Sequence, residues 1–140
     1  MRSKAPLALM ELTIMVLVFA LAAALCLRAF TWSDARSIRN EARDQAVLQA
    51  ESAAEVLKHS QGDFAQASAI LGGSWDGSTW TISYDTQWQT TDGPSSYALS
   101  VQPEDSGQLY LGQANVEVID ADGASLVQLT VCWQEVSEHD

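Results

Sequence analysis

The chain has 140 residues, 47% of them hydrophobic, and a formal net charge of −11. All seven lysines and arginines lie at or before Lys58, whereas the remainder carries twelve aspartates and glutamates. Because phosphate groups need lysine or arginine to neutralise them, this composition argues against nucleic acid and anionic lipid as partners of the acidic C-terminal part.

A run of apolar residues extends from Ala5 to Leu27, and its only charged residue is Glu11. At about 1.5 Å per residue this run can cross a hydrocarbon core of roughly 30 Å. A helix without a polar face satisfies its own backbone groups inside lipid. The sequence therefore predicts a single transmembrane helix over residues 7–28 after a short basic leader, residues 1–6. A cleavable secretory signal is the alternative, although its apolar region is usually shorter, about 7 to 15 residues.

Glu11 needs an explanation because a lone carboxylate near the start of a span is costly to bury. One interpretation is that its side chain reaches the headgroup region from a position only a few residues inside the span. The other is that it has a partner which neutralises its charge. The residues alone leave both interpretations open.

Residues 7–14, Leu-Ala-Leu-Met-Glu-Leu-Thr-Ile, follow a leader with two basic residues and resemble the start of a type IV pilin or pseudopilin. That family has a basic leader, a Gly-Phe-Thr-Leu-X-Glu junction and then a long apolar stretch. In this alignment Leu9 matches the leucine of the junction, Glu11 its glutamate and Leu7 the methylated first residue of the processed chain. The resemblance implies that Glu11 is an assembly residue that meets the amino terminus of a neighbouring subunit.

The position before the expected cut departs from the family pattern, because Pro6 replaces the glycine. Cleavage after Pro6 and methylation of Leu7 are thus implied by the resemblance but left open by the sequence. Basic residues flank the span on both sides, so charge does not decide its orientation. The resemblance implies a cytoplasmic N-terminus and a C-terminal domain that is extracytoplasmic or part of a surface filament.

Residues 29–60 are predicted to continue the helix, because the segment to His59 contains no glycine or proline and is rich in helix formers. Apolar residues at helical spacing form a stripe. The stripe comprises Ala35, Ile38, Ala42, Ala46, Ala53 and Leu57. Arg36, Arg39 and Arg43 form a basic stripe beside it. Either this amphipathic helix covers its own domain with its charges in solvent, or its charged flanks meet neighbouring subunits.

Residues 61–140 are predicted to form an acidic β-sheet domain. Asp63 is placed to cap a short helix that runs through Leu71 and stops at Gly72-Gly73. Beyond it, apolar and polar residues alternate with the period of strands, and Asp76-Gly77 is a hairpin turn. The strands expected beyond that turn are Trp80 to Tyr84, Tyr97 to Pro103, Leu109 to Ile119 and Val127 to Trp133. The predicted fold is α+β, with the long helix packed on a small antiparallel meander.

The sequence shows no catalytic set, so we expect no enzymatic activity and no cofactor. His59 and His139 are isolated, and Cys26 and Cys132 are placed too far apart in the predicted elements to form a disulfide. Asp120 and Asp122 are weak candidates for a calcium loop, and a plain hairpin turn explains them better. Some pseudopilins that the chain resembles bind calcium in loops near the C-terminus.

Aromatic residues are frequent in the predicted sheet, and most of them suit a small core. Trp88 lies in a polar segment and is the best candidate for an exposed ligand contact.

We expect the chain to be a structural, minor pilin-like or pseudopilin-like subunit of a type IV pilus, type II secretion or DNA-uptake apparatus. Its expected partners are other pilin-like subunits and an inner-membrane assembly platform. The alternative is a monomeric, single-span membrane-anchored protein that binds a surface ligand through its aromatic-rich domain.

Overall fold

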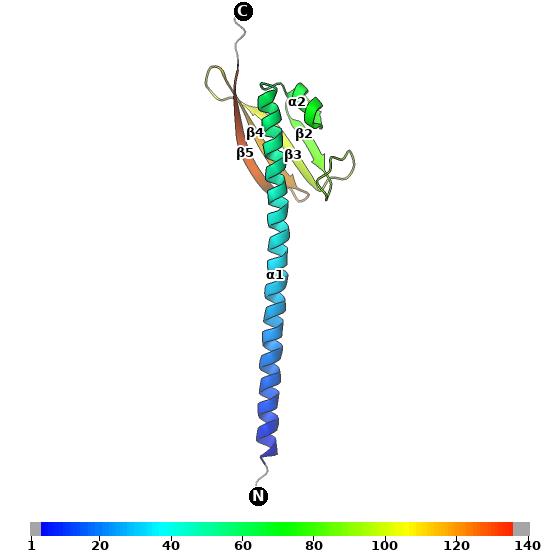
Figure 1. Ribbon diagram of the computed structural model, residues 1–140, viewed down its shortest axis with the longest axis vertical. Coiled ribbons are helices and arrows are strands. Elements are labelled where there is room, and N and C mark those ends of the chain that lie inside the picture. The colour runs from blue at the N-terminus through cyan, green and yellow to red at the C-terminus, as the bar shows by residue number, and fades with distance from the viewer. Residues whose placement is uncertain (1–3, 136–140) are drawn as a thin grey trace, which may run out of the picture. The chain divides into compact units, whose positions relative to one another are not determined.

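The computed structural model describes residues 4–135 and divides into two compact units, Met1–Asn40 and Glu41–Asp140 (Figure 1). One helix, α1, belongs to both units. The elements, in chain order, are α1 (Ala5–His59), α2 (Phe64–Leu71), β1 (Ser74–Trp75), β2 (Trp80–Tyr84), β3 (Tyr97–Glu104), β4 (Leu111–Asp120) and β5 (Ser125–Gln134).

The described part of the first unit is almost entirely helical, and its side chains are exposed within that unit. Alanine, leucine and methionine favour a helix here. Pro6 fits because it lies in the first turn, where a missing N–H costs no intrahelical hydrogen bond. By length and composition α1 could cross a membrane, and none of its most apolar stretch is buried.

The second unit contains the rest of α1, which packs on the sheet through small side chains. Ala46, Ala50, Ala53 and Leu57 are fully buried on one face of the helix. Alanine has little volume, so the helix backbone can lie close to the large side chains of the sheet. Of the predicted apolar stripe, Ala46, Ala53 and Leu57 are buried on the domain, as the first of the two interpretations expects. Ala35 and Ile38 belong to the first unit and are exposed.

The sheet has five strands in the order β1-β2-β3-β4-β5, and each neighbouring pair is antiparallel. The predicted meander is therefore confirmed, with a two-residue first strand added. Trp80, Ile82 and Tyr84 alternate with less buried residues along β2, as their period of two predicts. The core face of the sheet also carries Leu99, Val101, Ala114, Val116, Val118, Val131 and Trp133.

Two strand boundaries differ from those predicted. β3 does not stop at Pro103 but continues to Glu104. The pairing of β2 with β3 ends at Trp80↔Val101, so β2 has no residue opposite Pro103. The backbone nitrogen of Pro103 points to this unpaired side, and its missing N–H therefore costs no hydrogen bond between strands. β4 begins at Leu111 rather than Leu109, and Leu109 is 86% exposed in the preceding loop.

Turn and cap residues behave as the sequence indicates. The Asp63 carboxylate accepts a hydrogen bond from the Gln66 N–H at 3.0 Å, and Gly72 ends α2 with φ of 100°. In the β1–β2 turn, the N–H of Thr79 and the N–H and hydroxyl of Ser78 donate to Asp76. These hydrogen bonds hold the pKa of the Asp76 carboxyl below its ordinary value of 3.8.

Phe64, the first residue of α2, connects the two outermost strands of the sheet. Its ring stacks on Trp75 of β1, with centroids 4.6 Å apart, and meets the edge of Trp133 of β5 at 6.2 Å. The Trp133 indole is in turn packed so tightly on the backbone of Gly62 and Gly112 that a Cβ at either glycine would overlap it. This aromatic cluster closes one end of the core.

Candidate functional site

The residues with predicted roles in assembly and processing lie in the first unit. Glu11 is exposed on α1, and its side chain has no hydrogen-bond or ion-pair partner among residues 4–135. Pro6 and Leu7 are exposed in the first turn of the same helix. Arg2 of the expected leader lies outside the described residues. The apolar surface around Glu11 is thus available to a membrane or to other helices.

The basic stripe of α1 starts with a contact inside the first unit. The Arg36 guanidinium lies over the Trp32 ring, 5.2 Å from its centroid, which is a cation–π geometry. Both residues line a shallow surface hollow together with Ala35, Arg39 and Asn40. The hollow is formed by one helix, so it has no opposing wall and does not define a ligand site.

Trp88 lies in the loop between β2 and β3, in the second unit. Its ring stacks on Tyr97 with centroids 4.0 Å apart and planes 9° apart, and it lies tilted against Tyr84 at 5.7 Å. Trp88 is half-buried rather than freely exposed, so one face of the predicted ligand contact is already occupied. Burial raises the pKa of the Tyr84 phenol to about 12.

The loop that carries Trp88 is held by one carboxylate. The side chain of Asp85 accepts hydrogen bonds from the N–H groups of Gln87 at 2.8 Å and Gln89 at 2.9 Å. This turn fixes Trp88 at φ of 61°, in the left-handed region that a bulky side chain rarely adopts. The stacking on Tyr97 and the Asp85 hydrogen bonds compensate for that backbone cost.

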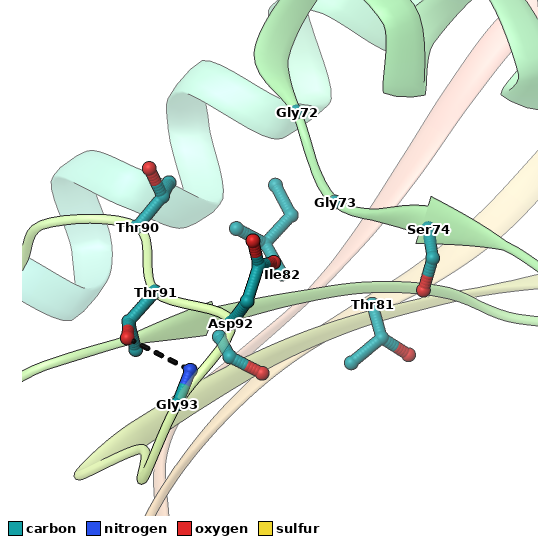
Figure 2. Close-up of a pocket in the computed structure, with 10 residues that line it drawn as sticks. Gly72, Gly73, Ser74, Thr81, Ile82, Thr90, Thr91, Asp92 and Gly93 are labelled. Atoms are coloured by element: carbon teal, nitrogen blue, oxygen red, sulfur yellow. Dashed lines mark hydrogen bonds between the residues drawn. The ribbon is translucent and has the colours of Figure 1, made fainter.

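A cavity of about 420 Å³ lies beside β2 in the second unit, and its lining comes from several segments (Figure 2). The Gly72–Ser74 segment and the Thr90–Gly93 segment both lie along the edge of β2 that faces away from β3. Hydroxyl groups dominate the lining, and Asp92 is its only charged residue. The lining residues are Gly72, Gly73, Ser74, Thr81, Ile82, Ser83, Thr90, Thr91, Asp92 and Gly93.

The lining of this cavity is rich in groups that form hydrogen bonds. Its hydroxyls and carboxylate can hold a small polar ligand, but the lining contains no histidine, cysteine or lysine to activate a nucleophile. Thr91 already accepts a hydrogen bond from the Gly93 N–H at 3.0 Å. No pattern in the sequence points to this cavity, because its residues come from three separate segments of small, polar composition.

Asp120 and Asp122 lie in the turn between β4 and β5. The Asp120 carboxylate accepts hydrogen bonds from the N–H groups of Asp122 at 3.0 Å and Ala124 at 2.9 Å, so it stabilises the turn itself. Within residues 4–135, no three histidine, cysteine, aspartate or glutamate side chains are grouped to hold a metal ion. The turn is a hairpin turn, as the sequence favours.

The structure brings some of the predicted site residues together. Tyr97 of β3 pairs with Asp120 of β4, so the Trp88 loop and the Asp120 turn lie at the same end of the sheet.

Cys26 and Cys132 are both exposed free thiols. His59 is exposed at the end of α1, and His139 lies outside the described residues.

Comparison of the chain with protein-family models, with curated proteins and with solved structures finds no match.

Proposed function

We propose that the chain is a structural, minor pilin-like or pseudopilin-like subunit of a type IV pilus, type II secretion or DNA-uptake apparatus. In this proposal it crosses the inner membrane once, with its N-terminus in the cytoplasm and its acidic domain outside or in a surface filament. Its partners are other pilin-like subunits and the assembly platform in the membrane. The observation that carries the proposal is the exposed apolar stretch of α1, whose only carboxylate is Glu11. The same helix goes on to cover a small antiparallel sheet.

The exposed surface of the first unit supports assembly through α1. Large apolar side chains such as Leu9, Val16 and Phe19 are all more than half exposed. Water makes such a surface unfavourable by about 25 cal/mol per Å² of apolar area, so lipid or other apolar helices must cover it. Neither environment solvates a carboxylate, and Glu11 therefore gains most from a cationic partner. The freed amino terminus of a neighbouring subunit would supply that cation.

The first test replaces Glu11 with glutamine, which keeps the shape and removes the charge. We expect Glu11→Gln to lower recovery of pilin-like partners with the chain by roughly tenfold, since an ion pair in an apolar medium is lost. Asp34→Asn is the matched control, because Asp34 is another exposed carboxylate on α1 beyond the apolar stretch. Recovery is measured by affinity purification from membranes of the native host after cross-linking. Equal recovery for wild type and Glu11→Gln would contradict the proposal.

The second test is the intact mass of the chain from native membranes together with the identity of its first residue. A cut after Pro6 and a methylated Leu7 would support a processed filament subunit, with a free amine available to pair with Glu11 of a neighbour. A chain that retains its leader would refute the processed form and leave Glu11 without that partner.

The alternative function, a single-span anchored binding protein, is favoured by the hydroxyl-lined cavity beside β2. In that case α1 serves only as an anchor, and an unrelated transmembrane helix can replace residues 7–28 without loss of function. Under the assembly proposal the same exchange abolishes recovery of partners. The helix exchange therefore separates the two functions in one experiment.

A further inference from the structure

The two edges of the sheet are protected to very different degrees. β1 is only two residues long, and the Thr90–Thr91 segment covers the next part of β2 through the Tyr84↔Thr90 bridge. At the other edge, β5 has ten residues and pairs only with β4 (Figure 1). One side of β5 is therefore open along its whole length within residues 4–135.

The register shows which backbone groups face this open side. Glu135 donates its N–H to the carbonyl of Tyr110, which continues the β4–β5 ladder beyond Gln134. Because N–H and C=O groups alternate in direction along an antiparallel strand, the residues at odd numbers from Val127 to Trp133 face β4. The N–H and C=O groups of Gln128, Thr130, Cys132 and Gln134 face outward.

β5 lacks the features that normally keep such an edge unpaired. Exposed edge strands usually carry a lysine, another charged side chain or a proline, which prevents a further strand from adding. The sequence of β5, SLVQLTVCWQ, has no charged residue and no proline. Its one irregularity is a register shift opposite Val118 and Ile119, near its first residues. The part from Val127 to Gln134 remains a regular template.

The charged residues near the two ends of β5 indicate what kind of strand can pair with it. Asp122 precedes the strand and Glu135 follows it, and the chain has no lysine or arginine after Lys58. A second copy pairing antiparallel through β5 would bring its acidic strand ends to those of the first copy, and like charges repel. A strand with basic ends meets a carboxylate at each end instead.

We propose that the outward edge of β5 binds an extended segment of a partner protein by strand addition, and that this segment has basic residues at its ends. Main-chain hydrogen bonds to Gln128, Thr130 and Cys132 provide affinity. Half-buried Leu129 borders the core face, and exposed Thr130 lies on the other face. The added segment therefore alternates apolar and polar residues. This binding is independent of assembly through α1.

The test uses the full-length chain, ¹⁵N-labelled, in nanodiscs of phosphatidylcholine. The probe is a synthetic peptide of alternating valine and threonine with a lysine at each end, and the comparison peptide has glutamates instead. We expect the lysine peptide to slow hydrogen exchange at the amides of Thr130 and Cys132, and to bind about tenfold more tightly than the glutamate peptide.

Two variants of one residue sharpen the test. Thr130→Pro removes an outward N–H that β4 does not use, so we expect the fold to persist and peptide affinity to fall about tenfold. Thr130→Val keeps the N–H and is expected to bind as the wild type does. If the Thr130→Pro variant does not fold, hydrogen exchange of the wild-type chain with and without the lysine peptide still tests the proposal.

Three outcomes would overturn the proposal. The first is the absence of added protection at β5 in the wild-type chain at millimolar lysine peptide. The second is equal binding of the glutamate peptide, which would remove the role of charge. The third is contact between β5 strands of two copies in a mixed-isotope sample without peptide, which would make a second copy the occupant.

Discussion

The two parts of α1 differ in the size of their side chains and in what those side chains contact. In the first unit the helix carries leucine, valine and phenylalanine, and these side chains are exposed. In the second unit its inner face is mostly alanine, and that face is fully buried on the sheet. The part of α1 that packs on the sheet therefore does so mainly through small side chains.

The sheet surface that faces the buried part of α1 explains why its side chains are small. The sheet already supplies large side chains, including Trp80, Ile82 and Leu99, so a helix with small residues completes a densely packed core. The described part of the first unit contains no sheet, and its large apolar side chains are exposed there. Substitutions at matched positions in the two parts test this comparison.

The largest expected effect comes from truncating a core aromatic residue. Trp80→Ala removes a fully buried indole that also donates a hydrogen bond to the carbonyl of Gly72 at 2.9 Å. We expect it to lower the free energy of unfolding of the domain by about 3 to 5 kcal/mol. Phe19→Ala, in the first unit, should leave domain unfolding unchanged. Urea unfolding of the full chain in detergent, followed by near-ultraviolet circular dichroism, measures both.

Adding volume to α1 tests the comparison most directly. Ala50→Leu inserts a large side chain between helix and sheet, and overpacking of this kind costs about 1 to 3 kcal/mol. Ala22→Leu is the same substitution on the exposed part of the same helix and should not affect the domain. Equal unfolding midpoints for the two variants would contradict the proposed close packing at Ala50.

A glycine substitution tests the aromatic cluster that closes the core. A methyl group at Gly112 would overlap the Trp133 indole, so we expect Gly112→Ala to destabilise the domain by about 1 to 3 kcal/mol. Gly93→Ala is the control, because a Cβ there meets only the Thr91 hydroxyl at 3.4 Å. Thermal unfolding of both variants distinguishes a steric effect from a general effect of losing glycine.

A smaller effect is expected at the cap of α2. Asp63→Ala removes the acceptor for the Gln66 N–H and should cost about 1 kcal/mol. Asp63→Asn keeps an acceptor and should restore most of that stability. Chemical denaturation curves of the two variants measure the difference, and equal loss in both would exclude capping as the cause.

The last prediction concerns pH. The folded domain raises the pKa of Tyr84 from 10.0 to about 12, so the folded state holds this proton more tightly than the unfolded state does. Stability is therefore fully present below pH 10 and is lost as the pH rises toward 12. Tyr84→Phe should lose less stability over that interval. The first unit has no tyrosine, so the effect belongs to the domain alone.

Local features of the fold could be predicted from the sequence where one segment decides them. The cap at Asp63, the stop at Gly72 and the alternation in β2 each follow from neighbouring residues. The strand limit at Pro103 was predicted wrongly, because the extent of β2 decides whether a proline is tolerated there. The roles of Glu11, Pro6 and Leu7 remain predictions.

The sequence by itself determined the long helix, its apolar first part and the order of the strands, because these depend on composition and periodicity along the chain. Only the tertiary structure decided which stripe residues are buried, that Trp88 stacks on Tyr97, and that β5 forms an open edge. These properties arise from contacts between segments distant in sequence. Such contacts depend on side-chain volume and strand register, which no local pattern specifies.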